Sequence, residues 1–212
     1  MHKVLITAGP TREPIDPVRF ISNHSTGIFG IEIAKAFLRK KIPTTLVHGP
    51  IHMATNLKLK KIPFTTTQDL QKILHKEIPH HTILFMAAAV ADFTPTKTSS
   101  HKIKRTQKTQ VLKLKPTPDI LNSLKKFKNN KFYVGFSIES KNPIQNGLKK
   151  LTHKNLDLLI SHHITDSKSP FGQNSIAPVL IYKGGKIQPL PQLSKRALAT
   201  RIANLVLAKV GH

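Results

Sequence analysis

The sequence is poor in several residue types on which functional sites often depend. It contains no cysteine, no tryptophan, two tyrosines and ten acidic residues in a chain of 212. The lack of cysteine excludes disulfides, thiolate zinc sites, iron–sulfur clusters and a thiol nucleophile supplied by this chain. The longest apolar run, residues 83–91, has nine residues, whereas a helix needs roughly 20 to cross a bilayer. We therefore expect no membrane span, and because no secretory signal pattern opens the chain, we predict a cytoplasmic protein.

Basic residues, in contrast, are abundant. The 34 Lys and Arg against 10 Asp and Glu give a net charge of +24. With 39% hydrophobic residues the chain can still bury a core, so it is not a disordered basic tail. The charge fits either a nucleic-acid-binding module or an enzyme that handles small anions. The scarcity of aromatic residues and the lack of zinc-ligand spacing make nucleic acid the less expected partner, although the charge alone does not decide.

Aliphatic runs alternate with helical periodicity along the chain. This pattern predicts an α/β fold: a Rossmann-like, three-layer open sheet, mostly parallel, in a single domain spanning 1–212. A hairpin around Gly184 and Gly185 and a last helix capped by Ser194 are expected to close the fold. Strands are expected at 3–8, 44–49, 62–67, 82–90, 111–116, 132–137 and 156–161, and helices at 25–41, 69–78, 118–127, 144–151 and 194–210.

One long segment breaks the alternation. Residues 94–109 are polar, basic and nearly free of apolar side chains. The segment follows the expected central strand at 82–90, and open α/β sheets bind ligands at the carboxyl ends of their strands. We therefore predict a flexible flap over a site, with an ordinary solvated loop as the alternative.

The loop after the first strand is a candidate anion site. It lacks the G-x-G-x-x-G pattern, so dinucleotide binding has little support. Gly9 and Gly27 permit close backbone approach, Arg12 and Arg19 offer cationic forks, and the helix expected to begin at Ser25 or Thr26 has free amides that could hold a phosphate or carboxylate. The alternative is a surface loop stiffened by its prolines.

Longer motifs make the assignment more specific. The stretch "VLITAGPTREPIDPVRFISNHSTG", followed in order by "AAAVADF", "KIK", "KPTPDIL", "VGF" and "KKLTHKNLDLLI", resembles the phosphopantothenoylcysteine synthetase (phosphopantothenate–cysteine ligase) family over nearly the whole chain. In many bacteria this domain follows a flavin-dependent decarboxylase. Because the chain begins at the synthetase strand, we expect a stand-alone form that holds no flavin, with any decarboxylase on a separate protein.

The resemblance implies a two-step ligation. The carboxylate of 4′-phosphopantothenate attacks CTP to give an acyl-cytidylate, and L-cysteine then displaces CMP. Mg²⁺ is expected to arrive with the nucleotide, held by phosphate oxygens and water, with no metal site made by the protein itself. Bacterial members of the family use CTP and eukaryotic members use ATP. The family builds its site between two subunits, which implies a homodimer.

Individual residues follow from the motif match. Asn23 matches the asparagine that converts the acyl-nucleotide, and Lys102 matches a flap lysine that stabilises the transition state and contacts the nucleotide. The remaining nucleotide-binding positions implied by the resemblance are Met86, Ala87, Ala88, Asp92, Thr117, Pro118, Asp119, Ile120, Phe136, Lys150 and Lys154. Lys150 and Lys154 are four residues apart, which would place both on one side of a helix that extends so far.

Several positions depart from the family pattern. Thr117 stands where Asn is usual, Ile28 where Lys is usual, and Ser137 and His162 also differ. These departures leave open a catalytically inactive homologue that still binds nucleotide. The adjacent histidine pairs at 80–81 and 162–163 are not expected to chelate a metal, because neighbouring residues on a strand point to opposite faces.

Overall fold

An eight-stranded sheet organises the molecule. The computed structural model describes residues 2–51, 57–164 and 174–211. Strand order in the sheet is β12-β11-β10-β9-β6-β1-β4-β5. The six strands from β10 to β5 pair in parallel, and β11 pairs antiparallel with both β10 and β12. The strands are β1 (Val4–Ala8), β4 (Thr44–His48), β5 (Lys60–Pro63), β6 (Ile83–Met86), β9 (Phe132–Glu139), β10 (Leu158–His163), β11 (Val179–Tyr182) and β12 (Ile187–Pro189).

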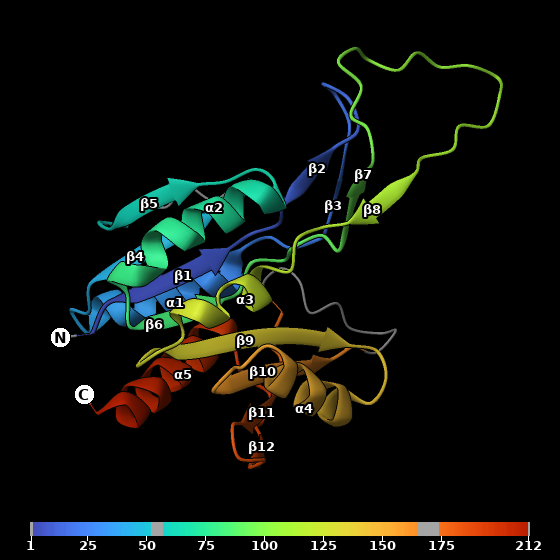
Figure 1. Ribbon diagram of the computed structural model, residues 1–212. Coiled ribbons are helices and arrows are strands. Elements are labelled where there is room, and N and C mark those ends of the chain that lie inside the picture. Colours follow the sequence, from blue (N-terminus) through green and yellow to red (C-terminus); the bar gives the residue numbers. More distant parts are fainter. Residues whose placement is uncertain (1, 52–56, 165–173, 212) are drawn as a thin grey trace.

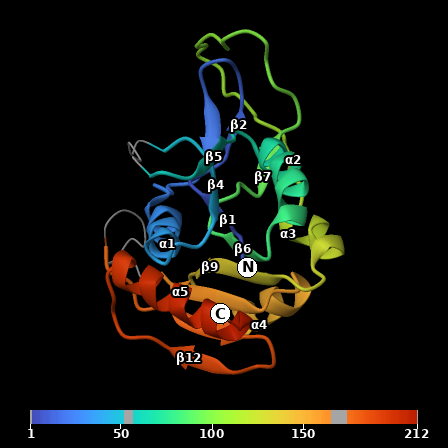
Figure 2. The same cartoon turned by 90° about the vertical axis from the view of Figure 1, so that its left-hand side faces the viewer.

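Helices cover both faces of this sheet and make three layers (Figures 1 and 2). α1 (Ile28–Arg39) and α5 (Lys195–Val210) lie side by side on one face. The other face carries α2 (Thr67–Glu77), α3 (Ile120–Ser123) and α4 (Pro143–His153), with 3₁₀ turns at Ile78–His80 and Lys125–Phe127. Both chain termini lie near the amino edge of the parallel strands (Figure 1).

Each face of the sheet has its own core, because side chains alternate along a strand. On β1, Ile6 packs into the cluster beneath α1 and α5, and its neighbour Leu5 packs into the cluster beneath α2, α3 and α4. Both side chains are fully buried. The aliphatic runs in the sequence therefore correspond to strands covered on both sides. The predicted α/β fold with a terminal hairpin and final helix is confirmed.

Two predicted element starts are corrected by capping interactions. α1 begins at Ile28 rather than near Ser25, because the Ser25 hydroxyl accepts from the Gly27 amide (3.3 Å) and does not cap the helix. The strand predicted at 62–67 forms at Lys60–Pro63. The helix predicted at 69–78 begins at Thr67, because Thr66 and Asp69 form a capping box that starts α2.

Three other predicted elements are too long. The strand predicted at 82–90 ends at Met86, because the next residues pair with the loop after β1: the Ala89 amide donates to the Gly9 carbonyl (3.0 Å). The helix predicted at 118–127 is α3 followed by a 3₁₀ turn. Only Leu114–Pro116 of the strand predicted at 111–116 is formed, and it lies outside the main sheet.

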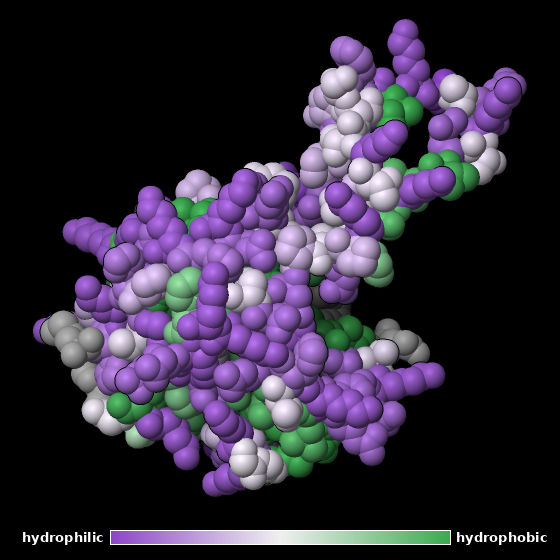
Figure 3. Space-filling view, in the orientation of Figure 1, coloured by the Kyte–Doolittle hydropathy of each residue, from purple (hydrophilic) through white to green (hydrophobic). Residues whose placement is uncertain are grey.

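Two small antiparallel ribbons were not predicted. β2 (Arg12–Pro14) pairs with β3 (Phe20–Ser22), and β7 (Phe93–Pro95) pairs with β8 (Leu114–Pro116). Together with their loops, residues 12–22 and 93–116 form what we call the arm, which stands out from the carboxyl edge of the sheet above a hollow in the surface (Figures 1 and 3). The segment predicted as a flap connects β7 to β8 at the tip of the arm; its flexibility stays a prediction.

No helix within the described ranges combines the length and the apolar character that crossing a bilayer would take.

Candidate functional site

A cavity of about 740 Å³ opens at the carboxyl edge of the sheet, below the arm. The strand order reverses between β1 and β6, because the crossover through α1 leads to β4 on one side of β1 and the crossover through α2 leads to β6 on the other. In open α/β sheets this switch point is where ligands bind. The cavity lining includes the following residues proposed from the sequence: Asn23, Ser25, Gly27, Met86, Ala87, Ala88, Asp92, Thr117, Pro118, Asp119, Ile120, Phe136, Lys150 and Lys154.

The start of α1 forms one wall of this cavity. Its N-cap, Gly27, has a left-handed backbone (φ 74°), and no side chain caps the helix. A Cβ at Gly27 would lie 2.7 Å from the Ile51 side chain and 3.1 Å from the Gly9 amide nitrogen, so only glycine fits there. The first-turn amides of α1 are left without a side-chain acceptor, which suits an anion.

Asn23 lies on the same wall and reaches across to the loop after β6. Its side-chain amide donates to the Ala89 carbonyl at 3.1 Å. Asn23 itself is exposed, so the contact holds the amide group at the surface of the cavity rather than in the core. An amide in this position can donate to an oxygen that gains negative charge, which a carboxylate could not do.

Two buried threonines shape the loop after β6, and neither was singled out from the sequence. Thr7 Oγ1 accepts from the Ala88 amide (2.9 Å), and Thr11 Oγ1 accepts from the Ala91 amide (3.0 Å). On the far side, the Thr117 hydroxyl donates to the Ala91 carbonyl (2.6 Å). These bonds replace sheet pairing, so the small side chains after Met86 face the cavity. A threonine in an otherwise aliphatic strand is the sequence signal that could have indicated Thr7.

Asp119 is paired in this structure. One carboxylate oxygen caps α3 by accepting from the Asn122 amide (3.0 Å), and the other binds the ammonium of Lys154. Burial opposes ionisation of Asp119, but the hydrogen bond from Lys154 and that from the Asn122 amide outweigh it and lower its pKa. An incoming anion would therefore compete with Asp119 for Lys154.

Lys150 lies one turn before Lys154, and both line the cavity, as the spacing predicts. Burial lowers the pKa of Lys150, while Glu139, Asp92 and Asp119 act in the opposite direction. A half-buried ammonium is costly unless it is neutralised, so this position favours a bound anion.

The cavity lining also contains three basic side chains that the sequence did not mark as site residues, and His24 is one of them. The other two, His162 and Lys195, line the cavity wall near α5. Burial lowers the pKa of both groups. Within the described residues, the His162 Nδ1 atom is buried and has no hydrogen-bond partner. Lys195 is 7% exposed. It is the first residue of α5, and the fold brings this end of the helix to the cavity.

Four proposed site residues do not line the cavity of the single chain: Gly9, Arg12, Arg19 and Lys102. Gly9, with φ 83°, packs against Ile51 and serves the turn after β1. The Arg12 guanidinium lies 4.4 Å from the centre of the Phe20 ring, and Arg19 is paired with Asp16. Lys102 is exposed on the flap.

The carboxylates of the cavity suit a metal that arrives with a ligand better than a resident one. Asp92 and Asp119 are the acidic residues in its lining, and Asp119 already binds Lys154. In the part of the chain that the structure describes, no three His, Cys, Asp or Glu residues gather as a metal site would require. A Mg²⁺ ion held mainly by phosphate oxygens and water would fit this donor set.

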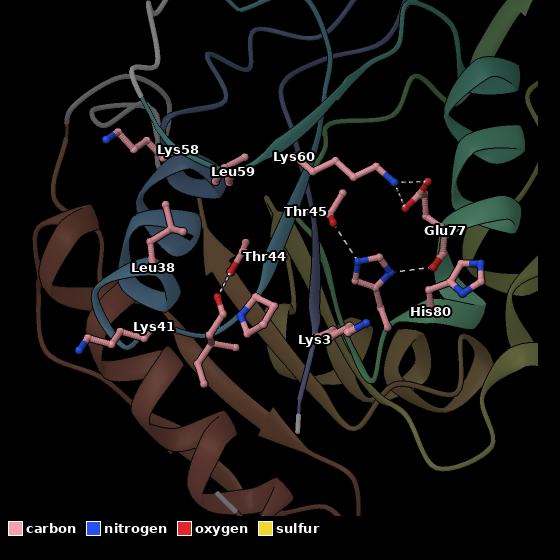
Figure 4. A pocket seen from close by; sticks show the side chains of 13 residues that line it. Lys3, Leu38, Lys41, Thr44, Thr45, Lys58, Leu59, Lys60, Glu77 and His80 are labelled. Carbon is pink, nitrogen blue, oxygen red and sulfur yellow. Dashed lines mark hydrogen bonds and ion pairs between the residues drawn. The ribbon is translucent and has the colours of Figure 1, made fainter.

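A second hollow, of about 600 Å³, lies at the opposite edge of the sheet between β4, β5 and α2 (Figure 4). The central polar groups of this hollow bind one another. Lys60 pairs with both carboxylate oxygens of Glu77 (2.9 Å each), and the ring nitrogens of His81 contact the Glu77 carbonyl (2.7 Å) and the Thr45 hydroxyl (2.9 Å). Because these groups are satisfied internally, the cavity at the carboxyl edge is the better candidate site.

Comparisons with known proteins identify the family of the chain. The family model described as "DNA/pantothenate metabolism flavoprotein C-terminal domain" matches residues 1–210. The chain is 36% identical over 207 residues to the coenzyme A biosynthesis bifunctional protein CoaBC of Vibrio cholerae, an alignment that covers 96% of this chain and 52% of that protein. It is 37% identical over 211 residues to a cysteine/cysteine sulfinic acid decarboxylase of an unknown prokaryotic organism. This alignment covers 99% of this chain and 59% of that protein.

A solved structure matches the whole fold. The crystal structure of the C-terminal domain of the coenzyme A biosynthesis bifunctional protein CoaBC superposes with a TM-score of 0.83 at 29% identity, covering 99% of this chain and 95% of that domain. The chain thus spans little more than half the length of the curated relatives it matches, and nearly all of this domain.

Proposed function

We propose that this chain, which belongs to the DNA/pantothenate metabolism flavoprotein C-terminal domain family, joins L-cysteine to 4′-phosphopantothenate in coenzyme A biosynthesis. The observation that carries the proposal is the cavity at the carboxyl edge, where motifs from five separate parts of the sequence meet. The CoaBC relative and the CoaBC domain structure are both named for coenzyme A biosynthesis, which supports a role in that pathway.

The proposed reaction uses CTP in two steps. The carboxylate of 4′-phosphopantothenate attacks the α-phosphate of CTP, which forms an acyl-cytidylate and releases pyrophosphate. The amino group of cysteine then attacks the acyl carbonyl and releases CMP. Neither step needs a protein nucleophile, so the absence of cysteine from the chain is no obstacle. The protein's task is to position the reactants and to stabilise negative charge.

The electrostatics of the cavity support binding of a triphosphate. Lys150 on α4 and Lys154, the residue that follows α4, line the cavity, and so does the uncapped start of α1. When a triphosphate binds, Lys154 exchanges Asp119 for phosphate oxygens. Mg²⁺ would enter with the nucleotide and neutralise part of its charge, with Asp92 as the nearest carboxylate to assist.

Asn23 is assigned to the second step. Its side-chain amide is held toward the loop after β6 by the bond to Ala89. From there it donates to the acyl carbonyl oxygen as cysteine attacks, when negative charge develops on that oxygen. Phe136, which packs edge-on against Phe29 at 5.3 Å between ring centres, offers an apolar surface for the nucleotide base.

A homodimer is the proposed working form. Lys102 lies on the arm and does not reach the cavity of its own chain. In a homodimer, the flap of one subunit would lie beside the cavity of the other subunit. The arm exposes several large apolar side chains, as expected of a surface that is covered in an assembly. These side chains are Val18, Phe20, Phe93, Val111, Leu112 and Leu114.

A direct assay tests the proposal. The purified protein is incubated with Mg²⁺, cysteine, 4′-phosphopantothenate and either CTP or ATP, and both pyrophosphate and the amide product are measured. We expect equal amounts of both products, with CTP preferred over ATP. No amide product with either nucleotide would refute the ligase, and CTP binding without pyrophosphate release would identify an inactive homologue. A decarboxylase activity, as in the name of one relative, would proceed without nucleotide.

A further inference from the structure

A buried aspartate ties the loop after β1 to the flap. Asp16 lies in the turn between β2 and β3, and its side chain is fully shielded from solvent. One carboxylate oxygen accepts from the backbone amides of Val18 and Arg19, both at 2.8 Å. These two bonds satisfy the local turn, as an aspartate at the start of a turn commonly does.

The second carboxylate oxygen is used outside the turn. It accepts from Nε of Arg19 (3.0 Å), from the other arm of the same guanidinium, and from the backbone amide of Ile103 (3.1 Å), which is 87 residues away in the sequence. The Arg19 guanidinium then donates to the Ile103 carbonyl at 2.7 Å. One ion pair therefore binds both backbone groups of a single flap residue.

Two further bonds fasten the same segment. The Thr98 hydroxyl donates to the Pro14 carbonyl (3.2 Å), and the Ser99 amide donates to the Ile15 carbonyl (3.0 Å). The flap is thus held at its first turn and again at Ile103. The hydrogen bond from Arg19 keeps the pKa of Asp16 well below its usual range, so Asp16 is ionised near neutral pH.

We propose that Asp16 is a positioning residue, which acts through Arg19 and Ile103 to hold Lys102 at a set place on the flap. The inference rests on the proposed function in one respect, namely that Lys102 serves the reaction. With the backbone pinned at the next residue, the Lys102 ammonium explores a smaller volume, and less conformational entropy is lost when the flap meets the substrates. The turn between β2 and β3 is satisfied by one oxygen of Asp16. The second oxygen is used by the contact with the flap instead.

The first test does not depend on the ligase activity. Trypsin cleaves after Lys102, Lys104 and Arg105, and the rate of cleavage at these bonds reports how often the flap backbone is released. In Asp16→Asn we expect these cleavages to be at least about fivefold faster than in the wild type, with cleavage elsewhere unchanged. Glu32→Gln, which removes the same charge from a surface pair with Lys35, is the matched control. Flap cleavage at the wild-type rate would overturn the proposal.

The second test is a double-mutant cycle on the rate of pyrophosphate release. Asp16→Asn should lower kcat about tenfold with the KM for CTP nearly unchanged, because it misplaces a group rather than removing a binding contact. In the Lys102→Gln background the same substitution should change kcat less than about twofold. If the loss of kcat in the double variant equals the product of the two single losses, Asp16 acts independently of Lys102, and the positioning role is refuted.

A second variant covers the case in which Asp16→Asn fails to fold. Ile103→Pro removes the flap amide that donates to Asp16 and leaves Asp16 and Arg19 in place, and residue 103 lies on the exposed flap. Because trypsin does not cleave a Lys–Pro bond, only cleavage after Lys104 and Arg105 is compared in this variant. It should be faster than in the wild type, and kcat should fall as in Asp16→Asn; wild-type values for both would count against the proposal. If the wild-type protein shows no ligase activity, the proposed function fails, and the trypsin rates still decide whether Asp16 holds the flap.

Discussion

The replacement of Asn23 by aspartate separates the two proposed half-reactions. The asparagine side chain donates to the Ala89 carbonyl at 3.1 Å. Aspartate has nearly the same shape but offers only acceptors, so it is repelled both by that carbonyl and by the acyl oxygen that becomes negative when cysteine attacks. The first half-reaction, at the α-phosphate of CTP, does not use this amide.

The magnitude follows from the loss of one donor to a developing oxyanion. Such a loss costs about 10²- to 10³-fold in rate. We therefore expect Asn23→Asp to slow amide formation by about that factor, while pyrophosphate release in a single turnover changes less than about tenfold. Because Asn23 is exposed, the free energy of unfolding should change by no more than about 0.5 kcal/mol.

Rapid-quench measurements of one turnover provide the assay. Labelled 4′-phosphopantothenate is followed into acyl-cytidylate and amide, and we expect the acyl-cytidylate to accumulate in the variant. Asn204→Asp is the matched control, since Asn204 is exposed on α5 outside the cavity. Unchanged amide formation in Asn23→Asp would refute the role assigned to this residue. An equal loss in both steps would show that the side chain only shapes the cavity.

Three further predictions concern stability and binding. Asp157 binds half-buried Lys128 and the Tyr133 amide, so Asp157→Ala should lower the free energy of unfolding in urea by about 2–4 kcal/mol. Gly27→Ala, at φ 74°, should weaken CTP binding in calorimetry by at least about tenfold, because the start of α1 must shift. The hydrogen bond from Lys154 holds the pKa of Asp119 below its usual value of 3.8. Its contribution to stability is therefore present above that pH and is lost as the pH falls through the folded pKa, where the difference in Tm between wild type and Asp119→Asn should vanish.

The core elements could be predicted because their signals are local. The runs at Val4–Ala8 and Ile83–Met86 are apolar on both faces, and such runs form central parallel strands whatever surrounds them. Ser194 caps α5 as predicted, accepting from the Ala197 amide at 3.2 Å. The two glycines of the terminal hairpin both have positive φ, which is why the turn could be recognised from their pair alone.

The ends of elements near the site could not be predicted, since long-range partners decide them. The strand at β6 stops at Met86 because Thr7 and Gly9, about 80 residues earlier, take the next amides. The ribbons of the arm are three residues long and are stabilised by each other and by Asp16. A segment that is polar and short in sequence carries no periodicity from which such pairing can be read.

The sequence by itself determined the family, the fold class and a set of candidate residues, because these depend on composition, periodicity and motifs that are read locally. Only the tertiary structure decided which candidates share a cavity: Asn23 and Lys150 meet at the carboxyl edge, whereas Lys102 stays on the arm. It also brought Lys195 to the cavity and Asp16 to the flap. Proximity across a sheet arises from strand order and chain crossover, and no local pattern of residues encodes those distances.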